Sequence, residues 1–467
     1  MVVDNPLDLP GNPSGSAMSL VSDTIKSLRR TLLVDEGLEF LEDPSDLRRL
    51  SRDCFDYSPV LQDQLAGCCA DLVVRPRDVA AVERLAAACS RHQVPLTVRG
   101  AGTGNYGQCV PLEGGVVMLT AELQTIRNLD PISGVVTVEP GCAMRDLDQW
   151  LRRHGRQLRL LPSTWRSASI GGFVSGGSGG IGSIRWGFLR DPGHLLGLEV
   201  VTMENRPQRL TLPAHQAEAL NHAYGTNGII TALQLATAPA VDWHQLAIDC
   251  KTWDDAVALM LACGRSAISL HLVTLLEQPL LQHLPKWSGP AGAGHRLLLL
   301  VSPDGVSSVQ RLADAHAAEL RDLGPEDLNG GNGLRELTWN HTTLHLRSAD
   351  PSWTYLQMLL PQPELVAMAR LRQRWGDALL WHLEAVRQQG SVRLAALPLV
   401  RWSDPQRLEQ LMNDCRDAGA VLFNPHVLTV EDGGLGVVDA DQVAAKQRFD
   451  PAGLLNPGKL RGWAERS

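Results

Sequence analysis

A glycine-rich segment between two short apolar runs constrains the fold of this chain more than any other feature. It spans residues 98–108 and reads VRGAGTGNYGQ, and residues 94–98 and 115–119 on either side are predicted to be strands. Glycine has no Cβ, so backbone N–H groups in such a loop can turn toward an anion and approach it closely. The glycine spacing formally matches G-x-G-x-x-G, but that dinucleotide-binding pattern requires a helix directly after the loop. Residues 109–115 read CVPLEGG and cannot begin a helix, so the NAD-type Rossmann interpretation fails.

A second glycine-dense segment lies farther along the chain, at residues 171–187 (GGFVSGGSGGIGSIRWG). Its eight glycines pack no core and suit contact between the backbone and a ligand. Between the two loops, residues 135–141 (VVTVEPG) predict a strand that ends in a Pro-Gly turn. Residues 144–154 have helical spacing, and Gly155 closes the predicted helix.

Three of these motifs resemble those of FAD-binding flavoproteins of the vanillyl-alcohol oxidase/p-cresol methylhydroxylase (PCMH) type. They are the Arg-Gly-x-Gly-Thr loop at Arg99–Thr103, the Val-Glu-Pro-Gly turn at Val138–Gly141 and the Ile-Gly-Gly segment at Ile170–Gly172, in the order of that family. Two later pieces also match, GIIT at residues 228–231 and FDP with LNPGK within residues 449–459.

The resemblance covers residues 70–240 and 420–460 and points to the glycolate/D-lactate-dehydrogenase-like branch, with a divergent C-terminal half. It implies an α+β fold, in which a two-part PCMH-type FAD-binding domain carries a substrate cap domain of antiparallel sheet and helices. A chain of 467 residues also exceeds the usual size of one domain. The expected parts are an N-terminal extension at 1–50 with a disordered start at 1–17, the FAD-binding domain at 51–239, the cap at 240–418 and a return segment to the FAD-binding domain at 419–467.

Periodicity also predicts individual elements. In the FAD-binding part, Asp78 is expected to cap a helix. In the cap, residues 329–333 (NGGNG) predict a flexible break. The remaining cap predictions are helices at 252–263, 307–323 and 363–376, and strands at 296–301 and 391–399.

The composition is that of an ordinary soluble globular protein, with 44% hydrophobic and 20% charged residues. The formal net charge of −8 argues against nucleic acid and anionic membrane surfaces as partners. Nine cysteines without a C-x-x-C pair favour free thiols in a reducing compartment. The N-terminus has no apolar signal core, and no apolar run is long enough to span a membrane. We therefore expect a cytoplasmic protein without a transmembrane segment.

The resemblance implies which residues hold FAD, with the first loop on the pyrophosphate. Members with a histidyl–flavin bond carry His where this chain has Thr103, and bicovalent members add a Cys where it has roughly Trp165, so noncovalent FAD is predicted. Arg99 has a structural ion pair as its alternative role, and plain strand core is the alternative for Ile229 and Ile230. The predicted FAD-binding residues are Arg99, Gly100, Ala101, Gly102, Thr103, Gly104, Asn105, Gly107, Gln108, Pro162, Ser163, Ser169, Ile170, Gly171, Gly172, Ser175, Gly176, Gly177, Ile229, Ile230, Asn456 and Lys459.

Oxidation of an alcohol or 2-hydroxy acid requires a base for the hydroxyl proton, and His is the usual one. Three histidines stand in polar clusters, namely His341, His382 and His426. A lone His is more often a surface or core residue, but core packing does not explain the loop position of His426. His426 is therefore the first candidate, with Glu431 as the acid that orients it. His341 and His382 are the alternatives.

Two further possibilities concern metal and carboxylate binding. His341 and His345, four residues apart, have the spacing of metal ligands and could act with His382 and Glu384. The resembled D-2-hydroxy-acid dehydrogenases carry His-Ala-Gly-Asp-Gly-Asn and Glu-His-Gly stretches here; this chain has neither, so no metal is predicted and their substrate is not carried over. Possible carboxylate clamps, or else surface charges, are Arg347 and Arg387.

The predicted function is that of an FAD-dependent oxidoreductase. It oxidises a small alcohol or a glycolate- or lactate-like 2-hydroxy acid by hydride transfer to flavin N5, and passes the electrons to oxygen or another acceptor. One alternative is an oxidase or dehydrogenase of a sugar or aldonolactone. The other is a non-catalytic flavin-binding subunit of a larger dehydrogenase.

Overall fold

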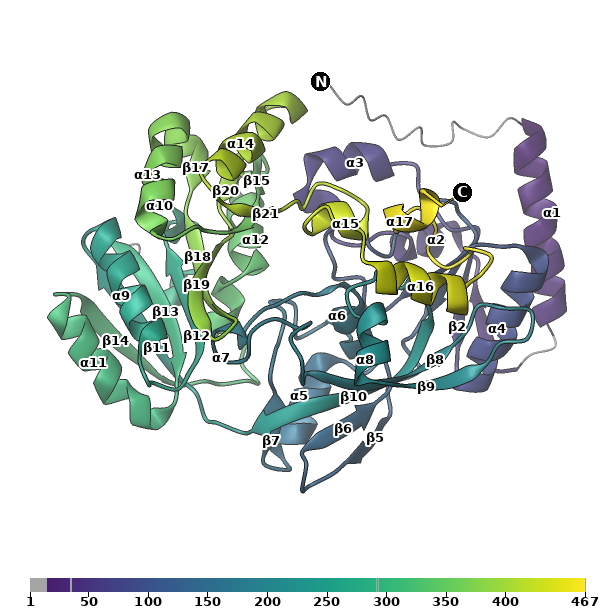
Figure 1. The fold of residues 1–467 in the computed structure, drawn as a ribbon, viewed down its shortest axis with the longest axis horizontal. Helices are drawn as coiled ribbons and strands as arrows, with labels where there is room; N and C mark the ends of the chain where they lie inside the picture. Colours follow the sequence, from purple (N-terminus) through teal and green to yellow (C-terminus); the bar gives the residue numbers. More distant parts are fainter. Residues whose placement is uncertain (1–14, 34–35, 291, 293, 467) are drawn as a thin grey trace.

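The computed structural model describes residues 15–33, 36–290, 292 and 294–466. The fold is mixed α+β, as predicted (Figure 1). Of the predicted disorder at 1–17, residues 1–14 lie outside the described residues. Residues 15–17 are helical, because α1 (Gly15–Leu32) begins at Gly15. Its residues Leu28 and Leu32 are buried in the same core as α4 (Val79–His92), beside which α1 lies.

The first glycine-rich loop joins two strands of a four-stranded sheet. The sheet order is β1 (Leu38–Leu41), β2 (Leu72–Pro76), β4 (Val116–Leu119) and β3 (Leu96–Arg99). The last three strands are parallel and only β1 is antiparallel, because α4 crosses over between β2 and β3. Asp78 accepts a hydrogen bond from the backbone N–H of Ala81, which confirms the predicted helix cap. The prediction of strand, loop and strand around residues 98–108 is also confirmed.

A second sheet carries the other motifs of the first half. Its order is β5 (Ile126–Leu129), β6 (Val135–Val138), β10 (Ile229–Pro239), β8 (Leu195–Val201) and β9 (Arg209–Pro213), with β7 (Arg156–Leu158) also paired to β10. All of these pairs are antiparallel. The predicted helix over residues 144–154 is present as α5 (Met144–Arg152).

An eight-stranded antiparallel sheet dominates the second half of the chain (Figure 1). In the interior strand β13 (His295–Val301), Leu297 and Leu299 face a core shared with the helices, whereas Leu298 and Leu300 face a core shared with the first half. Burial on both faces explains the unbroken apolar run of this strand. The sheet order is β14 (Glu319–Pro325), β11 (His244–Cys250), β13 (His295–Val301), β12 (Leu270–Leu276), β18 (His382–Gln388), β19 (Ser391–Ala396), β16 (Gln357–Leu359) and β21 (Val421–Phe423).

Helices cover one face of this sheet, and a small sheet lies at its side. The helices are α9 (Trp253–Arg265), α11 (Val306–Ala315), α13 (Glu364–Trp375) and α14 (Pro405–Asp417), and the three-stranded sheet has the order β15 (Trp353–Tyr355), β20 (Leu399–Arg401), β17 (Leu379–Leu380).

Two predicted elements in this half are wrong in part. The helix expected at 307–323 ends at Ala315, where Ala317 has a positive φ of 49° and the chain turns back. The following residues form β14, because pairing with β11 satisfies their backbone groups. The strand expected at 391–399 is divided into β19 and β20, which belong to different sheets.

The C-terminal segment leaves the cap sheet at β21 and returns to the first half (yellow in Figure 1). It contains α15 (Val430–Gly433), α16 (Ala440–Phe449) and α17 (Arg461–Ala464). Leu455 forms a β-bridge with Leu96, and so the segment lies against the strand that leads into the first glycine-rich loop. The other helices are α2 (Pro44–Leu50), α3 (Pro59–Leu65), α6 (Ile170–Gly176), α7 (Ser183–Trp186), α8 (Ala214–Ala217), α10 (Gln278–Leu281) and α12 (Asn340–Ala349).

Candidate active site

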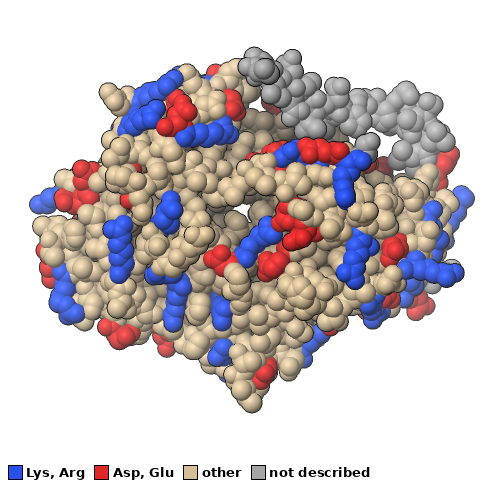
Figure 2. Space-filling view, viewed as in Figure 1, with Lys and Arg blue, Asp and Glu red and all other residues tan. Residues whose placement is uncertain are grey.

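A pocket lies between the glycine-rich loops and the cap, and encloses about 1560 Å³, part of it open to solvent. On the cap side it is lined by residues 339–341, Gln357 and Leu397. Figure 2 shows a hollow between the two halves of the molecule, with both acidic and basic side chains around it. The opposite wall exposes much backbone, because eleven of its lining residues are glycines: Gly100, Gly102, Gly104, Gly171, Gly172, Gly176, Gly177, Gly179, Gly180, Gly225 and Gly228.

In the first loop, Gly102 adopts a φ of +69°, a conformation that favours glycine. A Cβ at this position would collide with the guanidinium group of Arg99, which lies directly beneath the loop. Arg99 is buried and donates to the backbone carbonyl of Arg52 and to Cys109 Sγ. Arg99 therefore supports the loop from behind and does not line the pocket.

The C-terminal turn also supports this loop. Lys459 Nζ donates to the carbonyl of Gly107 (2.7 Å), and Asn456 Nδ2 donates to the carbonyls of Gln108 and Tyr224 (both 2.7 Å). Burial lowers the pKa of Lys459 to about 8, although the carboxylate of Asp53 opposes the shift. Burial raises the pKa of Asp53 to about 6, against the pull of Lys459 and Arg99. These groups fix the position of loop carbonyls and leave the other face of the loop for a ligand.

The second loop approaches the Val138–Gly141 turn closely. The N–H of Gly171 donates to the carbonyl of Pro140 (2.9 Å), and a Cβ on Gly171 would collide with the Pro140 ring. Ser169 caps α6 by accepting a hydrogen bond from the N–H of Gly172 (3.3 Å). The two family-like motifs therefore contact each other directly, and glycine is required where they meet.

Most of the predicted FAD-binding residues line this pocket. The others lie behind it: Arg99, Gly107, Ile170, Ile229, Asn456 and Lys459. Ile170 and Ile229 belong to hydrophobic cores. The sixteen that line it are Gly100, Ala101, Gly102, Thr103, Gly104, Asn105, Gln108, Pro162, Ser163, Ser169, Gly171, Gly172, Ser175, Gly176, Gly177 and Ile230.

On the cap side, His341 lies in the first turn of α12 and lines the pocket. Its Nδ1 is 3.3 Å from Oε2 of Glu336, and Arg166 Nε donates to Oε1 of the same carboxylate (2.7 Å). Burial would raise the pKa of Glu336, but the hydrogen bonds from His341 and Arg166 outweigh it and hold the pKa below its usual value. A charged carboxylate therefore orients the imidazole of His341.

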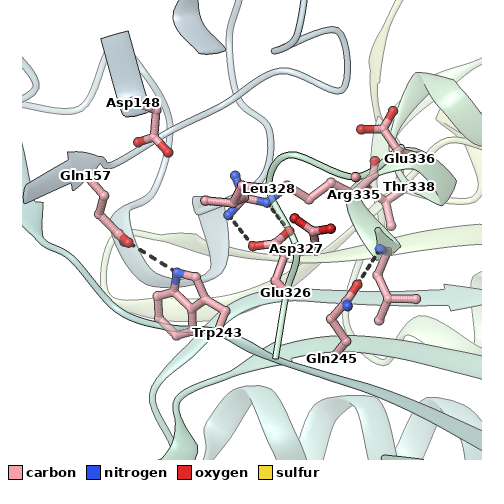
Figure 3. Close-up of polar contacts among 12 residues, drawn as sticks. Asp148, Gln157, Trp243, Gln245, Glu326, Asp327, Leu328, Arg335, Glu336 and Thr338 are labelled. Atoms are coloured by element: carbon pink, nitrogen blue, oxygen red, sulfur yellow. Dashed lines mark hydrogen bonds and ion pairs between the residues drawn. The ribbon is translucent and has the colours of Figure 1, made fainter. Parts of the chain in front are cut away.

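Residues 326–336 are attached to the first half of the chain by Arg166 and by the ring of Trp165. Arg166 also donates to the carbonyls of Leu328 and Gly330 (3.1 and 2.6 Å). Arg335 forms a two-bond ion pair with Glu326 (2.6 and 2.7 Å; Figure 3). Both guanidinium groups lie over the ring of Trp165, at 4.5 and 5.4 Å from its centroid. Trp165 thus fills a packing position beside the loop that carries Glu336.

Nearby, the same close-up shows the junction between the halves. Trp243 Nε1 donates to Gln157 Oε1 (3.3 Å), and Gln245 Oε1 accepts from the backbone N–H of Leu334 (2.8 Å; Figure 3). Asp148 accepts a hydrogen bond from the N–H of Leu158 (2.8 Å). The start of the cap is therefore bonded both to α5–β7 and to the segment that leads to His341.

His426 does not line the pocket, and its expected partner is wrong. The imidazole is buried, with Nδ1 2.7 Å from Ser58 Oγ and Nε2 2.9 Å from the carbonyl oxygen of Tyr355. Burial lowers its pKa to about 4. The carboxylate of Glu431 accepts instead from the backbone N–H groups of Arg461 and Gly462 (3.0 and 2.8 Å). Both ring nitrogens of His426 are engaged inside the protein, so its loop position does have a packing explanation.

His382 also lies away from the pocket lining and is fully buried. Its Nε2 is 2.8 Å from Glu384 Oε1, and the other oxygen of Glu384 accepts from Thr274. Among the described residues, no group of three or more His, Cys, Asp or Glu side chains is arranged to hold a metal ion. His345 Nε2 contacts the backbone carbonyl of Glu336 (2.8 Å).

The two arginines considered as carboxylate clamps are bound elsewhere. Arg347 donates to the carbonyls of Trp353, Pro351 and Asp56. Arg387 donates to the carbonyls of Ile184 and Gly390 (3.1 and 3.0 Å). Neither residue lines the pocket, so neither acts as the expected clamp there.

Sequence reasoning missed the tyrosines. The chain has only four, and Tyr57, Tyr106 and Tyr224 line the pocket. The hydroxyl of Tyr355 accepts from Asn105 Nδ2 in the first loop (2.7 Å). Tyr106 donates to Gln357 Oε1 (2.7 Å), which joins the loop to the cap. The rarity of tyrosine was a possible signal, but these residues are far apart in the sequence and only the fold gathers them.

Comparisons with known proteins agree with this architecture. Residues 70–211 match the FAD binding domain family. The glycolate oxidase subunit GlcD of Bacillus subtilis is 32% identical over 176 residues, which is 38% of this chain and 36% of that protein. The D-lactate dehydrogenase of Archaeoglobus fulgidus is 26% identical over 91% of this chain and 98% of that protein. A solved alkyldihydroxyacetonephosphate synthase superposes with a TM-score of 0.72 at 16% identity, covering 97% of this chain and 86% of the other.

These findings confirm the class of protein. Residues 70–211 carry an FAD binding domain, as predicted, and the chain is similar to FAD-linked oxidoreductases. The pocket fits FAD, because its wall of glycine backbone leaves room for a dinucleotide to approach. The described residues include no helix long and apolar enough to cross a membrane.

Proposed function

We propose that this oxidoreductase acts on the CH–OH group of a small donor, with His341 as the base. The observation that carries the proposal is that His341 alone of the three candidate histidines lines the pocket, and does so beside the charged carboxylate of Glu336. The names of two relatives, a glycolate oxidase subunit and a D-lactate dehydrogenase, support an alcohol or 2-hydroxy acid as the donor.

The protein residues divide the work between the two sides of the pocket. Glu336 accepts the Nδ1 proton of His341, which leaves Nε2 free to take the hydroxyl proton of the donor. FAD, when bound, supplies the hydride acceptor. The backbone of Gly100–Gly104 and of Ser175–Gly177 would hold the cofactor, and the cap residues would cover the donor and exclude water.

We infer further that FAD is held noncovalently. Thr103 lines the pocket where His-linked members carry their nucleophile, and its hydroxyl accepts a hydrogen bond from Thr164. Acid precipitation is expected to release all of the yellow colour, and flavin left in the pellet would contradict this. We also propose that the protein is cytoplasmic and passes its electrons to oxygen or another acceptor, as part of a larger dehydrogenase. The proposed domains are the FAD-binding domain at 51–239, the cap at 240–418 and the return segment at 419–467.

Anaerobic mixing with a panel of alcohols, 2-hydroxy acids and aldoses tests the activity directly, because flavin reduction bleaches the yellow colour. His341→Ala is expected to slow reduction by about a hundredfold or more, the usual scale for a lost general base, with FAD content unchanged. His426→Gln is the control and should reduce at nearly the original rate. If the fully loaded protein is bleached by no donor of the panel, the activity is wrong and a purely flavin-binding subunit is favoured.

A further inference from the structure

We propose that the donor is an uncharged hydroxylated molecule and not a 2-hydroxy acid anion. This inference rests on the proposed function and narrows it. Among the described residues that line the pocket, none is Lys or Arg. A carboxylate brought into such a place loses its water and needs a guanidinium or ammonium partner to offset that cost.

The arginines near the pocket are already bonded to protein groups. Arg99 is occupied beneath the first loop by the carbonyl of Arg52 and by Cys109. Arg166 is shared between Glu336 and two backbone carbonyls. Arg347 donates to three backbone carbonyls, one of them from Asp56, next to the pocket residue Tyr57. Recruiting any of these guanidinium groups for a donor carboxylate would break bonds that hold the pocket walls.

The charged groups that do line or adjoin the pocket disfavour an anion. His341 is the one lining side chain that gains a positive charge, and the carboxylate of Glu336 lies against its ring. Asp53 also lines the pocket, and its Oδ2 atom is buried without a hydrogen-bond partner among the described residues. A donor carboxylate would therefore meet two acidic side chains and, among the residues that line the pocket, no Lys or Arg. The formal net charge of −8 adds a weak long-range repulsion in the same direction.

Neutral polar atoms on the cap side fit hydroxyl groups instead. Trp339 and Asn340 both line the pocket, and Trp339 Nε1 and Asn340 Oδ1 are buried without a partner among the described residues. One is a donor and the other an acceptor, and a hydroxyl group can satisfy both because it gives one hydrogen bond and accepts others. A carboxylate has no proton to give to Asn340 Oδ1. The neighbouring Tyr106–Gln357 pair is likewise uncharged and hydrogen-bonded.

The test compares donors that differ only in whether they carry CH2OH or a carboxylate: glycerol with glycerate, propane-1,2-diol with lactate, and sorbitol with gluconate. The measurement is the rate of anaerobic flavin reduction per donor concentration. In each pair of which at least one member reduces the flavin, we expect the neutral donor to have at least a tenfold higher kcat/KM than the acid. Equal values, or higher values for the acids, would overturn the inference while leaving the proposed activity intact. Reduction by no donor would instead remove the activity and the inference together.

A gain-of-function variant makes the same test from the protein side. Asn340→Arg places a guanidinium at the pocket and should raise the acid-to-neutral ratio of kcat/KM by at least about tenfold, the equivalent of one favourable ion pair. Ser348→Arg, on an exposed position of the same helix, is the matched control and should leave that ratio unchanged.

A binding measurement separates recognition from turnover. Calorimetric titration of the FAD-loaded protein with oxalate, an unreactive carboxylate, should give no binding below millimolar concentration for the natural protein and measurable binding for Asn340→Arg. Flavin content and melting temperature show whether each variant is folded. Submillimolar oxalate binding by the natural protein would contradict the inference even if the variants failed to fold.

Discussion

The two sides of the pocket are built from different material. The flavin side presents much backbone, with eleven lining glycines and a few aromatic side chains such as Tyr106 and Tyr224, and its long cations Arg99 and Lys459 lie behind the wall. The cap side presents side chains, among them Trp339, Asn340 and His341. A backbone wall is built from positions that require glycine, and such positions can be recognised in a short stretch of sequence. A side-chain wall depends on which distant segments the fold brings together.

The supports of the two walls differ in the same way. Behind the flavin side, buried Asn456 and Lys459 bond to backbone carbonyls of the loop. On the cap side, His341 is held by an ionised carboxylate that is itself held by Arg166 from the other half of the chain. Damage to the first wall should therefore abolish cofactor binding, whereas damage to the second should leave the cofactor in place and slow the chemistry. Variants of each wall test this division.

The largest effect is expected from Gly102→Val. Valine is strained at a φ of +69°, and its Cβ would collide with the Arg99 guanidinium beneath the loop. The loop must then move, and we expect the purified variant to contain no FAD while its cap remains folded. The ratio of flavin to protein absorbance measures the first outcome, and circular dichroism measures the second.

Gly67→Val is the matched control, because Gly67 has no atom within 4 Å of the position of an added Cβ. It should bind FAD like the natural protein. A full flavin complement in Gly102→Val would show that the backbone wall tolerates a side chain, and the proposed contrast between the walls would fail.

This contrast also explains what the sequence could and could not predict. The motifs at Arg99–Thr103 and Ile170–Gly172 are local, because a glycine is required wherever a turn or a close backbone contact needs it. The fold class and the flavin side of the pocket followed from such motifs. His426 was misjudged because its two partners, Ser58 and the carbonyl of Tyr355, are remote in the sequence. A loop position alone could not show that its ring is buried.

The same limit applies to the rest of the cap side. His341 was one candidate among three, and nothing near it in the sequence shows that Arg166 would cross from the other half to hold Glu336. The error over residues 307–323 has a related cause. Helical periodicity continues past Ala315, but pairing with β11 decides the conformation of β14.

An intermediate effect is expected from Glu336→Gln. Glutamine keeps the shape but removes the charge that orients His341, so we expect kcat to fall roughly ten- to hundredfold, the equivalent of one hydrogen bond to a charged group. FAD content and KM should change little, because Glu336 does not line the pocket. Stopped-flow flavin reduction measures the rate. Partial recovery in Glu336→Asp would distinguish the charge from the packing of the side chain.

Asp327→Asn is the control for this variant, since Asp327 is an exposed carboxylate in the same loop (Figure 3). Its rate should equal that of the natural protein. Loss of FAD from Glu336→Gln, or an unchanged kcat, would mean that the cap side does not act through this carboxylate.

The smallest effect is a change in the pH dependence of stability in His426→Gln. Burial lowers the pKa of His426 to about 4 in the folded protein, from 6.5 for a free imidazole. Between these two pH values the imidazole is protonated in the unfolded chain but neutral in the folded protein. This group therefore lowers the free energy of unfolding as the pH drops from about 6.5 toward 4. The loss between pH 7 and pH 5 should be about 1–2 kcal/mol, and glutamine at this position removes it.

Urea unfolding of both proteins at pH 7 and pH 5 measures the difference. Asp53, whose raised pKa acts in the opposite direction over part of this range, is present in both and cancels in the comparison. The variant should therefore be less sensitive to acid than the natural protein, whatever its stability at pH 7. It should also reduce flavin at a nearly natural rate, because His426 does not line the pocket. Equal losses of stability on acidification would mean that the imidazole can take up a proton in the folded protein. A slow reduction rate would mean that His426 takes part in catalysis after all, and would contradict the proposed division of roles between the two walls.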